Sequence, residues 1–258
     1  MLMMMGGNSA LSRRGISSYV PPPAPLSIPA YWGWYGDSHT AGREPEVTAN
    51  KPQTCFKIMW DASYTPATID THYLNGQSGR SLANTLLRCL GRTHAGTPWI
   101  HMQESGDQNN DGQRTASEFG ATFQQGWEDV YALWPDGFFS YETAHSFSPA
   151  RKAQPYRNWD TYNVELRSRI ETLAGLGITV HLVETEYYID LAIAEFGYDT
   201  VCFPDAHADA YHFQGLGNFA IALAQFKAYN YNVTALDHSG INLNSTQKAT
   251  AVAIVAGN

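Results

Sequence analysis

Stretches with the apolar pattern of a β-strand alternate along this chain with stretches that carry the apolar stripe of a helix. The clearest helical stripe runs from Phe119 to Trp134 at spacings of three and four residues, and Thr115 with Glu118 forms a capping box at its start. About five alternations predict a three-layer α/β/α sandwich with a mostly parallel, five-stranded, flavodoxin-like sheet. Strands are expected over 31–35, 69–74, 99–103, 138–141 and 178–183, and further helices over 82–90, 162–173 and 216–226.

The chain divides into a short leader and one domain. Residues 1–28 contain small residues, serines and a proline-rich run, which predicts a flexible tail, and 29–258 are expected to form a single domain. The apolar opening is too short for a signal peptide and no positive residue precedes it. We therefore expect a cytoplasmic protein or one carried on a larger particle such as a phage tail. No apolar run approaches 18 residues, so no membrane span is predicted.

Charge and cysteine content narrow the possible partners. The formal net charge is −8 and no run of Lys or Arg occurs, which argues against a nucleic-acid partner. Three scattered cysteines, Cys55, Cys89 and Cys202, have neither the spacing of a metal site nor the even count of a disulfide framework. We interpret them mainly as small core residues, with a single disulfide bridge left open as the alternative.

Two short motifs at opposite ends of the domain predict nucleophilic chemistry. Ser38 lies in a Gly-Asp-Ser turn directly after the first predicted strand, and Asp209 and His212 form an Asp-x-x-His motif before the last predicted helix. A serine hydroxyl needs an imidazole to take its proton and a carboxylate to orient that imidazole. Because ligands of such sheets bind at the carboxyl ends of the strands, we expect Ser38 and the loops after the second and third strands to meet at one edge.

These motifs resemble the blocks of the SGNH hydrolases, the GDSL-type esterases and lipases. The match comprises Gly36-Asp37-Ser38, the run 75–79 that ends in Ser78-Gly79, and Asp209-x-x-His212 followed five residues later by Gly217. Asp205 and His207 offer a second pair, but no glycine stands five residues after His207. The resemblance implies hydrolysis of carboxylic esters through a Ser38–His212–Asp209 triad and an acyl-enzyme, with no required cofactor or metal.

The oxyanion hole implied by the resemblance is complete except for one block. The backbone N–H groups of Ser38 and Gly79 would donate to the oxyanion, together with an amide side chain from the loop after the third strand. The family has Gly-x-Asn-Asp there, whereas this chain has Gly106-Asp107-Gln108-Asn109. Either Gln108 or Asn109 is therefore the expected third donor, because the two side chains carry the same amide group.

A calcium loop is the competing interpretation of the same segment. Asp107, Asn109, Asp111 and Glu118 match the spacing of a calcium-binding loop, although a strand rather than a helix would enter it. The alternative hypothesis is thus a non-catalytic calcium- or carbohydrate-binding module on the same fold. The run 103–115 also resembles esterase-like tail-associated proteins of actinobacterial phages.

The sequence leaves the substrate open. The family includes enzymes that act on lipids, thioesters, aryl esters and O-acetylated sugars, so the expected partner is a lipid, an aryl ester or an acetylated carbohydrate. Aromatic side chains are either the lining of such a pocket or ordinary core residues. They are Trp32, Trp34, Tyr64, Trp159 and Tyr211.

Overall fold

A computed structural model describes nine segments of the chain. They are residues 23–29, 31–36, 51–64, 75–76, 81–94, 96–103, 115–145, 159–204 and 212–258. Several residues singled out from the sequence lie outside these segments. They are Ser38, Gly79, Asp107, Gln108, Asn109, Asp111, Asp205, His207, Asp209 and Tyr211.

The centre of the molecule is a five-stranded sheet with the order β2-β1-β3-β4-β5. Every neighbouring pair of strands is parallel, which confirms the predicted sheet. The predicted second strand, 69–74, falls outside the described residues, and the observed β2 begins immediately after it. The strands are β1 Tyr31–Gly36, β2 Asn75–Gly76, β3 Pro98–Gln103, β4 Phe138–Glu142 and β5 Val180–Val183.

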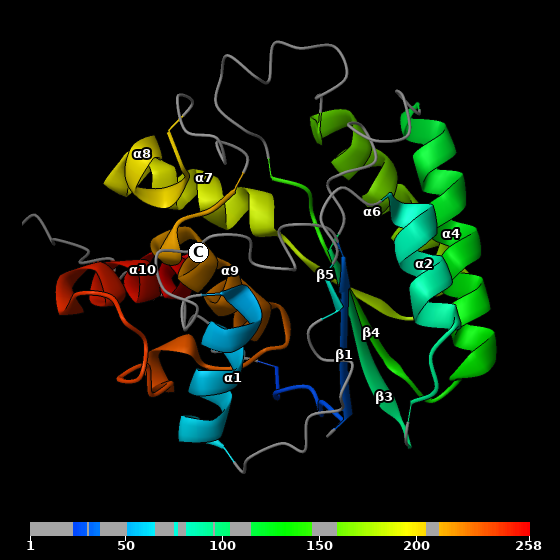
Figure 1. Ribbon diagram of the computed structural model, residues 1–258, viewed down its shortest axis with the longest axis horizontal. Helices are drawn as coiled ribbons and strands as arrows, with labels where there is room; N and C mark the ends of the chain where they lie inside the picture. Colours follow the sequence, from blue (N-terminus) through cyan, green and yellow to red (C-terminus); the bar gives the residue numbers. More distant parts are fainter. Residues whose placement is uncertain are drawn as a thin grey trace, which may run out of the picture.

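Helices cover both faces of the sheet, as expected for a three-layer α/β/α sandwich. α2, α4 and α6 lie on one face, and α1, α7, α9 and α10 lie on the other (Figure 1). The helices are α1 Pro52–Ser63, α2 Leu82–Leu90, α4 Ala116–Leu133, α6 Trp159–Gly175, α7 Thr185–Phe196, α8 Tyr198–Val201, α9 Gly215–Ala228, the 3₁₀ helix η3 Val233–Ala235 and α10 Ser245–Gly257.

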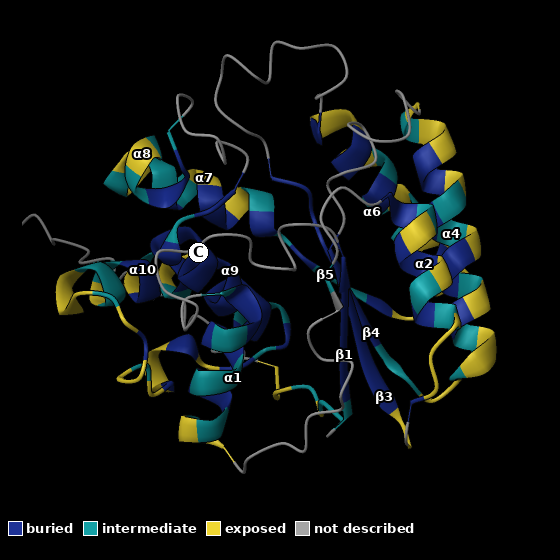
Figure 2. Cartoon of the chain, viewed as in Figure 1, coloured by how far each residue is buried: buried dark blue, intermediate teal, exposed yellow. Residues whose placement is uncertain are grey.

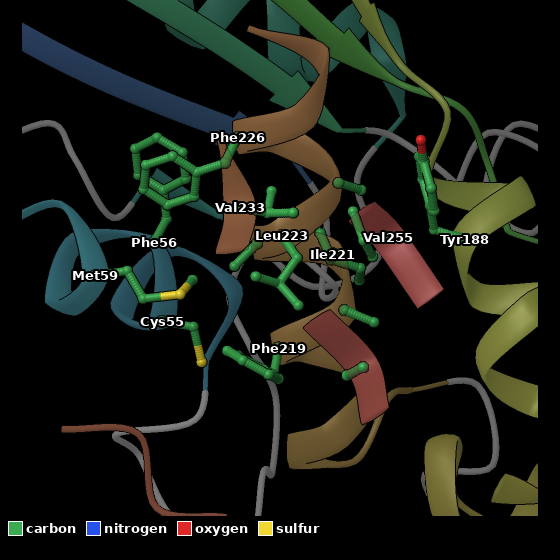
Figure 3. Packing of buried hydrophobic residues seen from close by; sticks show 14 of the residues in the cluster. Cys55, Phe56, Met59, Tyr188, Phe219, Ile221, Leu223, Phe226, Val233 and Val255 are labelled. Carbon is green, nitrogen blue, oxygen red and sulfur yellow. The ribbon is translucent and has the colours of Figure 1, made fainter. Parts of the chain in front are cut away.

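The sheet separates the two large apolar clusters of the described residues. On the α2–α4–α6 face the amphipathic helices keep exposed outer surfaces, whereas α9 is buried along almost its whole length (Figure 2). α9 packs between the sheet and α1, α7 and α10, and the ring of Phe226 stacks on Phe56 of α1 at 4.1 Å (Figure 3). Such a helix is apolar all round because every side of it is covered.

Burial decides between the interpretations of two groups of residues, the aromatics considered for a pocket and the cysteines. Trp32, Trp34 and Trp159 are at most 2% exposed, so they belong to the core and do not line an open pocket. The cysteines are buried and free, as expected for small core residues, and burial raises the pKa of Cys55 to about 12. Of the aromatics considered for a pocket, Tyr64 is exposed.

The last residues of the predicted tail contact the domain. The Leu26 N–H donates to the Tyr229 carbonyl at 2.9 Å, and the Tyr231 hydroxyl donates to the Leu26 carbonyl at 2.7 Å. Leu26 and Ile28 pack against the core beside α9. Residues 1–22 lie outside the described part of the chain, so the flexibility of the tail stays a prediction. Within the described segments, no helix is long and apolar enough to cross a membrane.

Candidate active site

The ends of three strands lie level at the carboxyl edge of the sheet. Gly36, the last residue of β1, pairs with Gly76 of β2 on one side and with Gln103 of β3 on the other. Ser38 follows Gly36 by two residues, and Gly79 follows Gly76 by three. The three segments that carry the predicted nucleophile and oxyanion donors therefore leave the sheet at one level, as the sequence predicted.

The backbone around His212 is fixed by the segment that precedes it. The Phe203 N–H donates to the His212 carbonyl at 3.0 Å, and Phe213 pairs with Cys202 in an antiparallel bridge. The Gln214 N–H donates to the Val201 carbonyl at 2.9 Å. These bonds fix the backbone of His212, whose side chain is 8% exposed, just before the first turn of α9.

Gly217 has a physical reason for standing five residues after His212. A Cβ atom at this position would lie 2.5 Å from the Val201 carbonyl oxygen and 3.0 Å from Phe213 Cβ. The first turn of α9 therefore approaches the segment 201–203 as closely as only a glycine allows. This close approach sets the distance between α9 and the bonds that hold His212.

His145 connects the His212 segment to the end of β4. Its buried ring packs edge-on against Phe213 with 5.0 Å between ring centroids, and its Nε2 lies 3.8 Å from Asp190 Oδ1 of α7. Because His145 stands only three residues beyond the end of β4, His212 is placed at the same carboxyl edge as the ends of β1, β2 and β3. Of the predicted triad, His212 is the member that lies within the described residues.

The residues after β4 are held by hydrogen bonds from two neighbouring elements. The Thr143 N–H donates to the Val183 carbonyl, and Thr143 Oγ1 accepts from the Glu186 N–H, both at 2.9 Å. Asn163 of α6 accepts from the Ala144 N–H at 2.9 Å and donates to the Ala144 carbonyl at 2.7 Å. This pair of hydrogen bonds imitates strand pairing and fixes the backbone that leads to His145.

A carboxyl group with an unusual pKa lies beside this segment. Burial, followed by a hydrogen bond shared with Asp160, raises the pKa of Glu186 to about 7, although the Asn163 amide donates to it at 2.7 Å and acts in the opposite direction. Arg167 pairs more closely with Glu184, with Nη2 2.6 Å from Oε2, than with Glu186, whose Oε2 lies 3.9 Å from the same nitrogen. The edge beside β5 therefore carries a carboxyl that titrates near neutral pH.

A second set of serine, histidine and carboxylate lies inside the molecule. His101 Nδ1 is 2.8 Å from Ser140 Oγ, and His101 Nε2 is 2.9 Å from Glu142 Oε1. All three residues are at most 2% exposed, and Gln225 of α9 donates to the same carboxylate oxygen. An ester has no access to this serine, so the set is a buried network that joins β3 and β4 to α9.

Glu118 has a structural role at the start of α4. Its carboxylate accepts from the Thr115 N–H at 2.8 Å, and Thr115 Oγ1 accepts from the Glu118 N–H at 3.2 Å, which confirms the capping box. The other three predicted calcium ligands lie outside the described residues. Within the described segments, no three acidic, histidine or cysteine side chains are grouped in a way that would hold a metal ion.

Known proteins resemble this chain in fold rather than in sequence. No protein-family model and no curated protein matches the sequence. Among solved structures, a member of the lipolytic G-D-S-L family from Veillonella parvula superposes with a TM-score of 0.57 at 14% identity, over 76% of this chain and 96% of that one. The chain has the SGNH-hydrolase fold.

Two further structures with the SGNH fold are esterases of carbohydrates. An acetylxylan esterase from Geobacillus stearothermophilus gives a TM-score of 0.62 at 13% identity, over 81% of this chain and 97% of that one. A family 3 carbohydrate esterase from Clostridium thermocellum gives a TM-score of 0.55 at 14% identity, over 86% and 98% of the two chains. At these identities the likeness concerns the fold alone.

Sequence analysis missed the residues that support the edge of this SGNH fold. Asn163, Glu186, Arg88 and His145 were not assigned to the site. Asn163 and Glu186 stand in helical stretches where a polar residue is ordinary, and their partners lie 19 to 43 residues away. The sequence pattern could have indicated only the polar positions of β3 and β4, because His101 and Ser140 interrupt otherwise apolar strands.

Proposed function

We propose that the protein is a serine esterase that hydrolyses carboxylic esters at the carboxyl edge of its sheet. The observation that carries the proposal is the common level of Gly36, Gly76 and Gln103, with His212 held at the same edge. In the SGNH fold this level is where the segments with Ser38 and Gly79 leave the sheet. The order of motifs along the chain supports the same conclusion.

The proposed mechanism assigns one task to each residue. Ser38 Oγ attacks the ester carbonyl while His212 takes its proton, and His212 then returns the proton to the leaving alcohol. Water hydrolyses the acyl-enzyme by the same route. Asp209 orients His212 and stabilises the imidazolium. The N–H groups of Ser38 and Gly79, with the amide of Gln108 or Asn109, hold the oxyanion, and loss of one such donor costs about 10²–10³ in kcat. No cofactor is required.

Among possible substrates we place O-acetylated carbohydrates first. Support comes from the solved structures that share the fold, since one is an acetylxylan esterase and another is a family 3 carbohydrate esterase. Aryl esters and lipids follow. A panel of acetylated xylan, p-nitrophenyl acetate and p-nitrophenyl esters of longer acyl chains separates these classes.

The test is hydrolysis by variants of the predicted triad. Ser38→Ala should abolish turnover of p-nitrophenyl acetate and labelling by a fluorophosphonate probe, and His212→Ala should lower kcat by about 10³ or more. Exposed Ser245 and half-buried His238 provide the matched controls Ser245→Ala and His238→Ala, which should retain full activity. Unchanged turnover in Ser38→Ala would reject the assignment. An inactive wild type whose melting temperature falls with chelator would favour the calcium- or carbohydrate-binding module instead.

A further inference from the structure

Arg88 joins the helix after the Gly79 loop to the strand before the Ser38 turn. It lies in the last turn of α2, whose N-cap, Ser81, follows Gly79 by two residues. The Arg88 Nη2–H donates to the carbonyl of Gly36 at 2.8 Å and to Thr85 Oγ1 at 3.1 Å. Gly36 is the last residue of β1, so this contact stands two residues before the predicted nucleophile.

The contact holds the two segments that carry the backbone oxyanion donors. Gly36 already pairs with Gly76 of β2, and Arg88 adds a second tie on the other side of the Gly79 loop. The helix that follows the Gly79 loop is thus tied to the end of β1 through its last turn, in addition to the strand pairing that precedes the loop. Small displacements matter here, because oxyanion donors act only within a few tenths of an ångström of the developing charge.

We propose that Arg88 is a positioning residue of the esterase, which holds the Ser38 turn against the Gly79 loop so that their two N–H groups converge on the oxyanion. This inference rests on the proposed function. The guanidinium suits the role because its rigidly held terminal nitrogen, Nη2, donates both to the Gly36 carbonyl and to the Thr85 hydroxyl. A lysine ammonium at this position would keep the charge without the fixed geometry.

A purely structural role would give a different result. Arg88 is also a cation in the last turn of a helix, where its charge interacts favourably with the helix dipole. If that were its whole contribution, its removal would lower the melting temperature slightly and leave kcat unchanged. Displaced oxyanion donors would instead lower kcat with little change in KM, because the bound ester carries no oxyanion and the negative charge develops only as the tetrahedral transition state is approached.

The experiment compares Arg88→Gln and Arg88→Lys with Arg92→Gln, an exposed arginine just beyond the end of α2. With p-nitrophenyl acetate we expect Arg88→Gln to lower kcat about tenfold to a hundredfold with KM within twofold of the wild type, and Arg88→Lys to be intermediate. Fluorophosphonate labelling should slow in parallel. Arg92→Gln should match the wild type.

Two results would overturn the inference. A folded Arg88→Gln with wild-type kcat rejects the positioning role and leaves the esterase itself intact, whereas an unreactive wild type rejects both. Should Arg88→Gln fail to fold, Thr85→Val removes the second acceptor at nearly constant volume, and together with Arg88→Lys it decides the question. A loss of kcat of about threefold or more in those variants supports the inference, and wild-type kcat in both refutes it.

Discussion

The substitution Gly217→Ala tests whether the first turn of α9 holds His212 in place. The added Cβ would lie 2.5 Å from the Val201 carbonyl oxygen, well inside van der Waals contact. Neither partner can yield easily, because Val201 accepts the Gln214 N–H and α9 is buried on all sides. Alanine in a helix otherwise gains about 1 kcal/mol over glycine, and overpacking in a core costs about 1–3 kcal/mol or more. We therefore expect a net loss of up to roughly 2 kcal/mol.

Gly175→Ala is the matched control for this substitution. Gly175 is the last residue of α6 and nothing lies within 4 Å of a Cβ built there, so alanine should be neutral or stabilising by up to about 1 kcal/mol. Urea unfolding measures both free energies, and kcat for p-nitrophenyl acetate reports the position of His212. We expect kcat to fall in Gly217→Ala and to stay unchanged in Gly175→Ala. A Gly217→Ala protein as stable and as active as the control would refute the close-approach argument.

Two further predictions concern buried polar groups. The pKa of Glu186 is raised to about 7, so its protonated form stabilises the fold fully below about pH 4.5 and this stabilisation is lost as the pH rises through 7. From pH 5 to pH 8 the free energy of unfolding of the wild type should fall by about 1–2 kcal/mol, a figure reduced because the Glu186 side chain is partly solvated. Urea unfolding at the two pH values should show a smaller fall for Glu186→Gln. Equal falls in the two proteins would contradict this prediction. His101→Phe should lower the free energy of unfolding by about 3 kcal/mol because it leaves the Glu142 carboxylate buried without its imidazole. Its kcat at a temperature where it is folded should remain near the wild-type value, and an abolished kcat would mean that the buried network takes part in catalysis.

The sequence predicted those elements whose periodicity is strong. β1, β3, β4 and β5 are short apolar runs bounded by polar residues, and α4 has both a complete stripe and a capping box. The helices α1, α7 and α10 were not predicted. α7 follows β5 after a single residue, Glu184, whose side chain makes no cap, and the core-facing residues of α10 are small alanines and valines that give a weak stripe.

The hydrogen bonds that support the site could not be predicted from local sequence patterns, and the reason is physical. Arg88 bonds a carbonyl 52 residues away, and Asn163 bonds a backbone 19 residues away in a different layer. Backbone carbonyls and N–H groups are the same at every residue, so no sequence pattern identifies which of them a side chain will reach. The strand ends were predictable because parallel strands in register bring their carboxyl ends to one edge.

The buried Ser140–His101–Glu142 set and the proposed Ser38–His212–Asp209 triad have the same composition and differ in their expected position on the sheet. Ser140, His101 and Glu142 come from the interiors and ends of β3 and β4, where alternation directs their side chains to one covered face under α9. Ser38 follows the end of β1 in the sequence, and His212 precedes the start of α9. A strand interior offers short, ordered contacts but no room for a substrate, whereas the loops beyond the carboxyl ends can be shaped around one. An active site on this fold is therefore expected from residues just past the strand ends, and the short distances inside the sheet are a reason to assign His101 to stability.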